Sequence, residues 1–165
     1  AMEGYGPGGV AIYCDVLTDN RNRAAGDIRH AFTKGGGNLG TSGCVAYMFN
    51  RRGVIATGSG VDEDTVMMAA IDAGAEDVEG IGDSAFEIVT EPAELEAVAK
   101  SLEEAGVSVA SEAVLFVPDS RVAVTGEDAM GLLRLLDLLD DCDDVQTVYH
   151  NADIAADAIE AYSNS

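Results

Sequence analysis

The chain has 165 residues and a formal net charge of −21; 47% of its residues are hydrophobic, and tryptophan is absent. It holds no run of 18 apolar residues, so no membrane-spanning helix is expected. A chain of this size buries roughly 68–70% of its unfolded surface, enough for one core or two small ones. These cores are expected to consist mainly of Ala, Val, Leu and Ile.

Three cysteines, Cys14, Cys44 and Cys142, are far apart and odd in number. This pattern argues against a disulfide framework and, since no CxxC pair occurs, against a zinc site. No metal and no cofactor are therefore expected. Reduced cysteines fit an intracellular compartment, which favours the cytoplasm, with an organelle matrix as the alternative.

The first elements are predicted from hydrophobic periodicity. Residues 10–17 are largely apolar at both their even-numbered and their odd-numbered positions, which indicates a strand with two apolar faces. Thr18, Asp19 and Asn20 then offer side chains for an N-cap, and a helix is expected over residues 20–34, ending at Gly35. A second strand is predicted over residues 44–49.

The next part of the chain shows the order β-α-β-β-α-β over residues 53–118, which is typical of ferredoxin-like units. Strands are predicted at 54–57, 77–81, 86–90 and 107–117. Asp62 caps the first helix, and Pro92 opens the second.

The last part resumes with a predicted helix over residues 127–139, which is apolar almost all round. Thr125 and Asp128 resemble a capping box at its start. A strand is expected at 145–149, and a weak helix with a frayed tail at 151–165.

The predicted fold class is α+β, with two α/β domains. Residues 3–52 and 121–150 supply β-α-β and α-β pieces that cannot bury their apolar faces alone. We therefore expect one discontinuous domain made of residues 3–52 and 121–165. A ferredoxin-like domain made of residues 53–120 is inserted into it.

Charge is distributed unevenly along the chain. Residues 3–52 contain six of the nine basic residues and four acids, a balance of +2, whereas residues 53–165 carry −23. This asymmetry predicts a polarised surface. The acidic part serves solubility or offers a face to protein partners.

A glycine-rich segment, residues 35–43, is the most unusual local sequence. It lacks the GK[ST] of a P-loop, and it follows a helix, which is the wrong context for a dinucleotide fingerprint. One interpretation is a helix C-cap running into a turn. The other is a loop whose N–H groups contact a phosphate backbone or a protein.

The first predicted helix carries a basic ridge. At 100° per residue, Arg23, His30 and Lys34 lie opposite the apolar side, with Asp27 beside them. The ridge is either a phosphate-contacting surface or a solvated face with an Arg23–Asp27 ion pair. Arg51 and Arg52 are expected nearby. The candidate binding residues are Arg21, Arg23, Arg29, His30, Lys34, Gly36, Gly37, Asn38, Arg51 and Arg52.

No catalytic site is expected. The two histidines, His30 and His150, have no nearby nucleophile and acid that would form a triad. The acidic runs at 62–64 and 140–144 lack the spacing of a calcium loop.

Six segments of the chain resemble conserved blocks of the YebC family. They are EGYGPGGVA at 3–11, LTDNRNR at 17–23, GGNLG at 36–40, VAY at 45–47, AGAED at 73–77 and DDVQTVYHN at 143–151. The resemblance covers about 150 residues and implies a ferredoxin-like domain inserted into an α/β domain. It also implies a Lys-rich helical domain that precedes these two in the family and has no counterpart in this sequence.

The family resemblance implies a non-enzymatic regulator of gene expression. We expect DNA to be the partner of a transcriptional regulator, acting through the full-length protein. The alternative is a ribosome-associated translation factor, with RNA as the partner. A third hypothesis, a small-molecule-sensing regulatory domain, rests on fold analogy alone.

Overall fold

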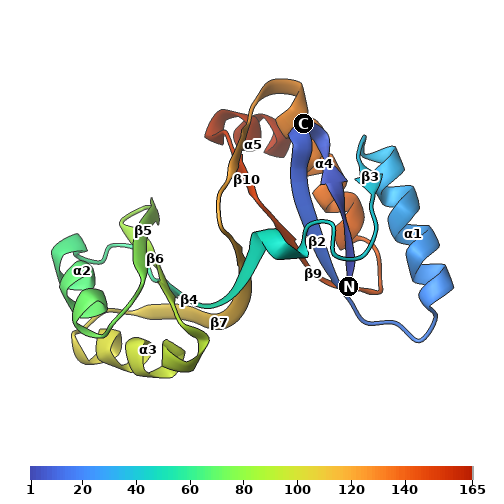
Figure 1. The fold of residues 1–165 in the computed structure, drawn as a ribbon. Coiled ribbons are helices and arrows are strands. Elements are labelled where there is room, and N and C mark those ends of the chain that lie inside the picture. Colours follow the sequence, from blue (N-terminus) through green and yellow to red (C-terminus); the bar gives the residue numbers. More distant parts are fainter. Residues whose placement is uncertain (165) are drawn as a thin grey trace. The chain divides into compact units, whose positions relative to one another are not determined.

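The computed structural model describes residues 1–164, which form two compact units (Figure 1). Residues 1–50 and 118–164 form the first, called here the outer unit. Residues 51–117 form the second, called here the inserted unit. Each unit has its own hydrophobic core.

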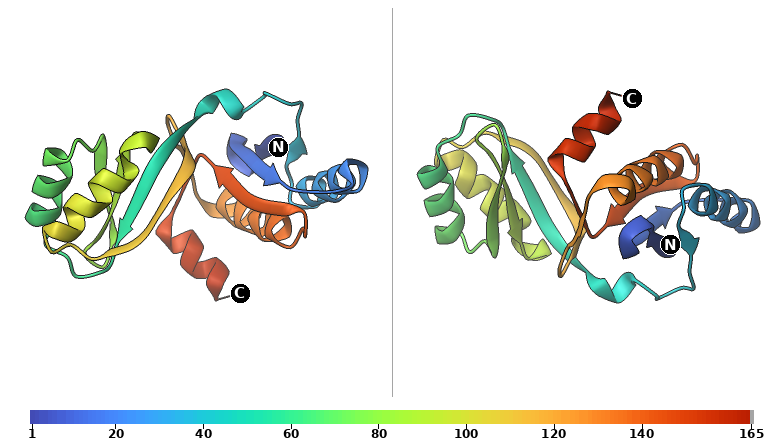
Figure 2. Two further views of the ribbon diagram at one scale, coloured as in Figure 1. Left: turned by 90° about the horizontal axis from the view of Figure 1, so that it is seen from below. Right: turned by 90° about the horizontal axis from the view of Figure 1, so that it is seen from above.

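The outer unit is built on a four-stranded antiparallel sheet with the strand order β3-β1-β2-β9. Its strands are β1 (Met2–Gly6), β2 (Val10–Val16), β3 (Asn38–Leu39) and β9 (Val145–His150). Helices α1 (Arg21–Lys34) and α4 (Gly126–Asp140) pack against each other and on this sheet (Figures 1 and 2).

A small parallel pair of strands, β8 (Val122–Val124) and β10 (Ala152–Ile154), flanks this sheet. Helix α5 (Ala156–Ser163) follows β10 and packs against α4. The hydroxyl of Tyr162 on α5 bonds the carboxylate of Asp137 on α4. The sequence predicts a weak helix with a frayed tail over residues 151–165; the structure has the strand β10 and then α5, which ends at Ser163.

The core of the outer unit lies between the sheet and the two helices. Alternation along β2 directs Val10, Ile12 and Cys14 into it, all with no exposed surface. Phe32 from α1 and Leu135 from α4 meet them there. Each buried Val, Ile, Leu or Phe side chain of this layer contributes roughly 1.5–3 kcal/mol by leaving water, so the layer holds α1 firmly in place.

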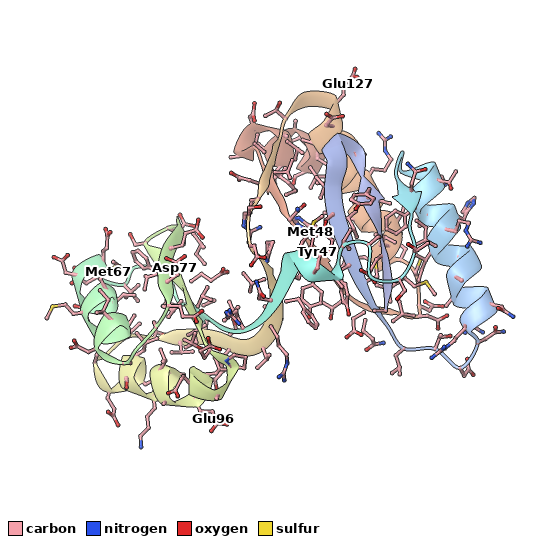
Figure 3. All side chains as sticks on the ribbon, in the orientation of Figure 1. Tyr47, Met48, Met67, Asp77, Glu96 and Glu127 are labelled. Carbon is pink, nitrogen blue, oxygen red and sulfur yellow. The ribbon has the colours of Figure 1, made fainter. Side chains whose placement is uncertain are left out.

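Two sequence predictions about this unit are wrong. Residues 44–49 do not form a strand: a turn leads into a short 3-10 helix, Ala46–Met48, and β4 (Phe49–Thr57) begins only afterwards. Tyr47 and Met48 mark this 3-10 helix in Figure 3. The capping box is also not formed, because Thr125 is the N-cap of α4 but its side chain makes no capping hydrogen bond.

The inserted unit has the expected ferredoxin-like fold. Its elements after β4 are α2 (Glu63–Asp72), β5 (Asp77–Gly82), β6 (Ala85–Thr90), α3 (Leu95–Glu104) and β7 (Val109–Pro118). The strand order β5-β6-β4-β7 confirms the split β-α-β arrangement inferred from the sequence. Pro92 begins a 3-10 turn, Pro92–Glu94, and α3 follows it at Leu95.

One face of the sheet in the inserted unit is covered by α2 and α3. Ile55 on β4 lies opposite Ile88 on β6, and both are fully buried. Val66 from α2 and Leu102 from α3 complete the same cluster. Within residues 1–164, no helix is both long and apolar enough to cross a membrane.

Candidate functional site

Helix α1 positions the basic ridge that the sequence predicted. The side-chain oxygen of Asn20 accepts a hydrogen bond from the Arg23 amide (3.1 Å), which confirms the expected N-cap. Ile28 and Phe32 are buried against the core, so the helix cannot rotate about its axis without exposing them. Arg23, His30 and Lys34 consequently project into solvent on the opposite side.

Helix α1 also differs from the other helices in charge. Its four Arg and Lys residues and single Asp give it a formal charge of +3, within a chain of −21. The other four α-helices of residues 1–164 are all net negative. Among the α-helices of residues 1–164, α1 is therefore the one with a positive formal charge.

An acidic loop faces the ridge. Residues 141–144, which connect α4 to β9, form one wall of a groove of about 530 Å³ whose other wall carries Arg23, His30 and Lys34. Arg23 bonds the carboxylate of Asp144 at 3.2 Å and that of Asp19 at 3.4 Å, rather than Asp27 as the helical spacing predicted. The ridge is thus partly neutralised by carboxylates of its own unit.

The pKa of the Cys142 thiol reflects the surroundings of this side chain in the groove. Its thiol is half-buried, and burial followed by the nearby carboxylates of Asp27, Asp141, Asp143 and Asp144 raises its pKa. Burial disfavours the thiolate most, and the surrounding negative charge disfavours it further. The groove is therefore a mixed site and not a simple cationic cleft.

The other basic candidates are divided between the two units. Arg21 and Arg29 are exposed on α1 but do not line it. Arg51 and Arg52 belong to the inserted unit, where Arg52 pairs with Glu76 at 3.0 Å and with Glu91 at 3.9 Å. Their contribution to the ridge stays a prediction.

The glycine-rich segment is a helix C-cap followed by a turn, as the first interpretation had it. The Gly35 amide donates to the Ala31 carbonyl oxygen (2.9 Å), and the Gly37 amide donates to that of Phe32 (2.8 Å). Gly36 takes a positive φ of 82°, which glycine adopts readily. The exposed Asn38 lies in β3, opposite Tyr5.

Glu3 was not predicted as a structural residue, yet it organises the end of this segment. Its carboxylate is buried (4% exposed) and accepts hydrogen bonds from the amides of Gly43 (2.6 Å), Val45 (3.0 Å) and Ala46 (2.6 Å). Burial opposes ionisation, but these donors outweigh it and lower the pKa of Glu3. Of the amides in the glycine-rich segment, that of Gly43 thus binds the protein's own carboxylate.

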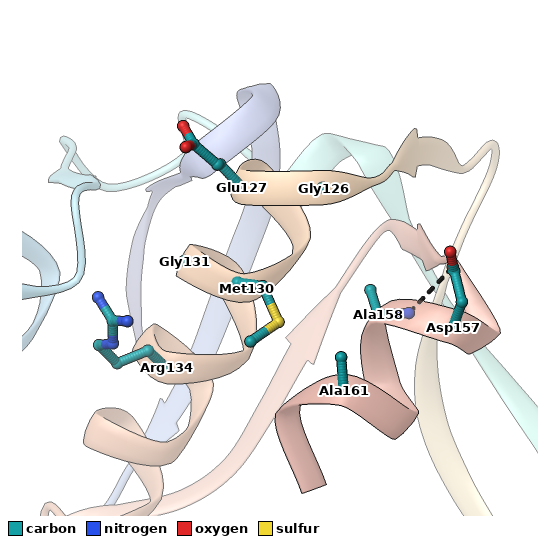
Figure 4. Close-up of a pocket in the computed structure, with 8 residues that line it drawn as sticks. All are labelled: Gly126, Glu127, Met130, Gly131, Arg134, Asp157, Ala158 and Ala161. Carbon is teal, nitrogen blue, oxygen red and sulfur yellow. Dashed lines mark hydrogen bonds between the residues drawn. The ribbon is translucent and has the colours of Figure 1, made fainter. Parts of the chain in front are cut away.

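A second groove lies between α4 and α5 (Figure 4). It encloses about 570 Å³, with Met130, Gly131 and Ala158 forming apolar surface and Arg134 at its rim. The carboxylate of Asp157 accepts a hydrogen bond from the Ala158 amide (3.0 Å) at the start of α5. The groove combines one base with acids and carries no cluster of cations suited to a polyanion.

His150 and the possible metal ligands are the remaining groups with chemical potential. His150 is half-buried, and its Nδ1 accepts a hydrogen bond from the Ala152 amide (3.1 Å). Burial, followed by the charge of Arg121, lowers its pKa. Over the described part of the chain, no three His, Cys, Asp or Glu side chains are arranged to hold a metal ion.

Fold and charge define a two-unit α+β protein with a ferredoxin-like insertion and, within residues 1–164, one basic α-helix. Residues 1–152 match the family described as TACO1/YebC, second and third domain, and the chain belongs to that family. The expected family is therefore confirmed.

Named relatives and a solved structure agree with this assignment. Probable transcriptional regulatory proteins of Desulfatibacillum aliphaticivorans and Symbiobacterium thermophilum are 52% and 56% identical over 158 and 156 residues, 95% and 93% of this chain. The crystal structure of a conserved hypothetical protein from Aquifex aeolicus matches 93% of the chain with a TM-score of 0.82 and 44% identity. The chain spans 64% of the length of each of these proteins.

Proposed function

We propose that the full-length protein is a non-enzymatic regulator of gene expression that binds DNA, and that α1 contacts the phosphate backbone. The observation that carries this proposal is the concentration of positive charge on α1, the one net-positive α-helix of residues 1–164. The relatives are named as probable transcriptional regulatory proteins, which supports the regulatory part of the proposal.

The geometry of α1 suits backbone contact better than base recognition. At about 1.5 Å per residue, Arg23 and Lys34 are roughly 16 Å apart along the helix, so the ridge follows several phosphates of one strand. Such contacts position a protein on the duplex without reading sequence. We therefore expect α1 to add affinity, with any base recognition supplied elsewhere in the protein.

The test is a salt titration of DNA binding. The full-length protein and its R23A/K34A variant are titrated into a labelled duplex of about 20 base pairs between about 50 and 200 mM salt. Each lost phosphate contact makes the negative slope of log K against log salt shallower by about 0.9, so the slope of the variant should be shallower by about 2. The matched control is the R134A/K100A variant, which removes equal charge elsewhere. Equal slopes for the two variants would refute the role of α1.

A ribosome-associated translation factor is the second candidate. It is favoured by the charge of the inserted unit: three basic and 15 acidic residues give −12, which suits the basic proteins that accompany ribosomal RNA. Crosslinking of the full-length protein in cells, followed by identification of the attached molecule, separates the candidates. Attachment to ribosomal RNA and not to DNA would replace the first candidate with the second.

The glycine segment is a poor target for such tests. A Cβ at Gly37 would run into the carbonyl oxygen of Tyr5 and lie 3.2 Å from the Gly6 Cα. A bulky residue there disturbs the packing of β1, so lost binding would report misfolding. Variants of the exposed α1 ridge avoid this ambiguity.

A further inference from the structure

Helix α2 of the inserted unit has apolar side chains on its outer face as well as on its inner face. Val66 and Ala70 are fully buried, whereas Met68 is 67% and Ile71 63% exposed. At 100° per residue, Met68 lies about 160° from both Val66 and Ala70. Neither solubility nor core packing explains large apolar residues on this face. A helix that is apolar on both sides normally packs against other structure on both sides.

Carboxylates surround these exposed side chains. Asp64 and Asp72 lie one turn before and after Met68, and both are exposed. Beside them, a depression of about 350 Å³ lies between α2 and α3. Small side chains, including Ala69 and Ala105, form part of this depression, and Asp72 and Glu104 contribute carboxylates to it. In Figure 3, Met67 marks α2 and Glu96 marks α3.

We propose that the outer face of α2 docks a cationic amphipathic segment of a partner protein. Apolar side chains of that segment cover Met68 and Ile71, and its Lys or Arg residues meet Asp64, Asp72 and Glu104. The formal charge of −12 on the inserted unit selects a basic partner and repels nucleic acid and a second copy of the chain. This surface is separate from α1 and does not depend on nucleic-acid binding.

The binding mode is the docking of an amphipathic segment along the exposed face of α2, beside the depression. Methionine and isoleucine supply the apolar anchors, and methionine in particular adapts to different partner side chains. The carboxylates steer the encounter and fix orientation, and the apolar contacts supply most of the affinity. Removing the apolar anchors should therefore weaken binding even when every carboxylate is retained.

The experiment uses the 165-residue chain and a fluorescein-labelled helix of Leu and Lys, about 14 residues long, with anisotropy as the readout. The M68S/I71S variant should bind this peptide at least about tenfold more weakly than the unmodified chain. The D72K/E104K variant should lose binding to a similar degree. The matched controls are L17S/I159S for exposed apolar residues and D157K/E160K for charge; both should bind like the unmodified chain.

A control peptide and a sedimentation measurement complete the test. A peptide of equal charge with Ser in place of Leu should bind at least about tenfold more weakly than the Leu peptide, because it lacks the apolar half of the contact. Equal binding of the two peptides, or equal losses in the control variants, would overturn the proposal. So would a dimer in sedimentation equilibrium that M68S/I71S abolishes, because the face would then serve self-association.

Discussion

Replacing Glu3 by Gln should destabilise the outer unit far more than an exposed Glu to Gln change. Glu3 is 4% exposed, and its two carboxylate oxygens accept three backbone amide hydrogen bonds of 2.6–3.0 Å. Gln keeps Oε1 for Val45 and Ala46 but turns an NH₂ group toward the Gly43 amide. One hydrogen bond is lost, and the other two lose the strengthening effect of the charge.

The expected cost is about 2 kcal/mol, the usual net value of a hydrogen bond to a charged group. For a protein of this size, that corresponds to a decrease in Tm of roughly 4–8 °C. Urea unfolding followed by circular dichroism measures the free energy, and differential scanning calorimetry measures Tm. The matched control is Glu160→Gln on α5, where the side chain is exposed and a change within about 0.5 kcal/mol is expected.

The pH dependence of the free energy of unfolding gives a second test of the Glu3 carboxylate's stabilising effect. Because the folded-state pKa of Glu3 is lowered, its ionised form stabilises the fold above the unfolded pKa of about 4.3. That contribution is lost as the pH falls through the folded pKa. The difference between the unmodified chain and the Gln variant should therefore shrink on acidification. Equal stability at pH 7, or a difference that stays constant into the acid range, would refute the role of the Glu3 carboxylate.

Three further predictions concern other sites. Asp144→Asn should raise the affinity of the full-length protein for a DNA duplex about threefold in the anisotropy assay, because the Asp144 carboxylate no longer pairs with Arg23; an equal rise in Asp157→Asn would instead indicate a net-charge effect. Gly37→Ala should lower the free energy of unfolding, measured in urea, by about 2 kcal/mol, because the added Cβ overlaps the carbonyl oxygen of Tyr5. Gly26→Ala has open space around its Cβ and should raise that free energy by about 0.5–1 kcal/mol by stabilising α1. An unchanged free energy for Gly37→Ala would contradict the overlap. The buried thiol of Cys14, whose pKa burial raises to about 12, should resist alkylation until the chain unfolds; labelling of all three cysteines in the native protein would show otherwise.

The elements that the sequence predicted correctly depend on local or periodic signals. Helix α1 was identified from its apolar spacing and the Asn20 N-cap, and both are interactions between residues close in the chain. The ferredoxin-like order followed from alternating strand and helix patterns. The family resemblance rested on ordered sequence blocks, and the match over residues 1–152 agrees with it.

Strand β1 and the structure of the segment after Gly40 could not be predicted from local or periodic sequence signals. Two glycines interrupt β1, so its apolar alternation is absent, and its pairing with β2 and β3 supplies the missing stability. Residues 44–49 look like a strand because they are apolar. Glu3, about 40 residues earlier, binds their amides and holds them in a turn and a 3-10 helix instead.

The concentration of positive charge on one helix, and the side of that helix that bears Arg23, His30 and Lys34, could be predicted from local sequence because helical geometry is local. What those side chains face depends on the packing of distant segments. Residues 141–144 are more than 100 positions away in the chain, yet packing of α4 against α1 and β9 against β2 brings their carboxylates to the ridge. Electrostatic interaction depends on distance in space, so the partial neutralisation of the ridge became visible only in the folded chain.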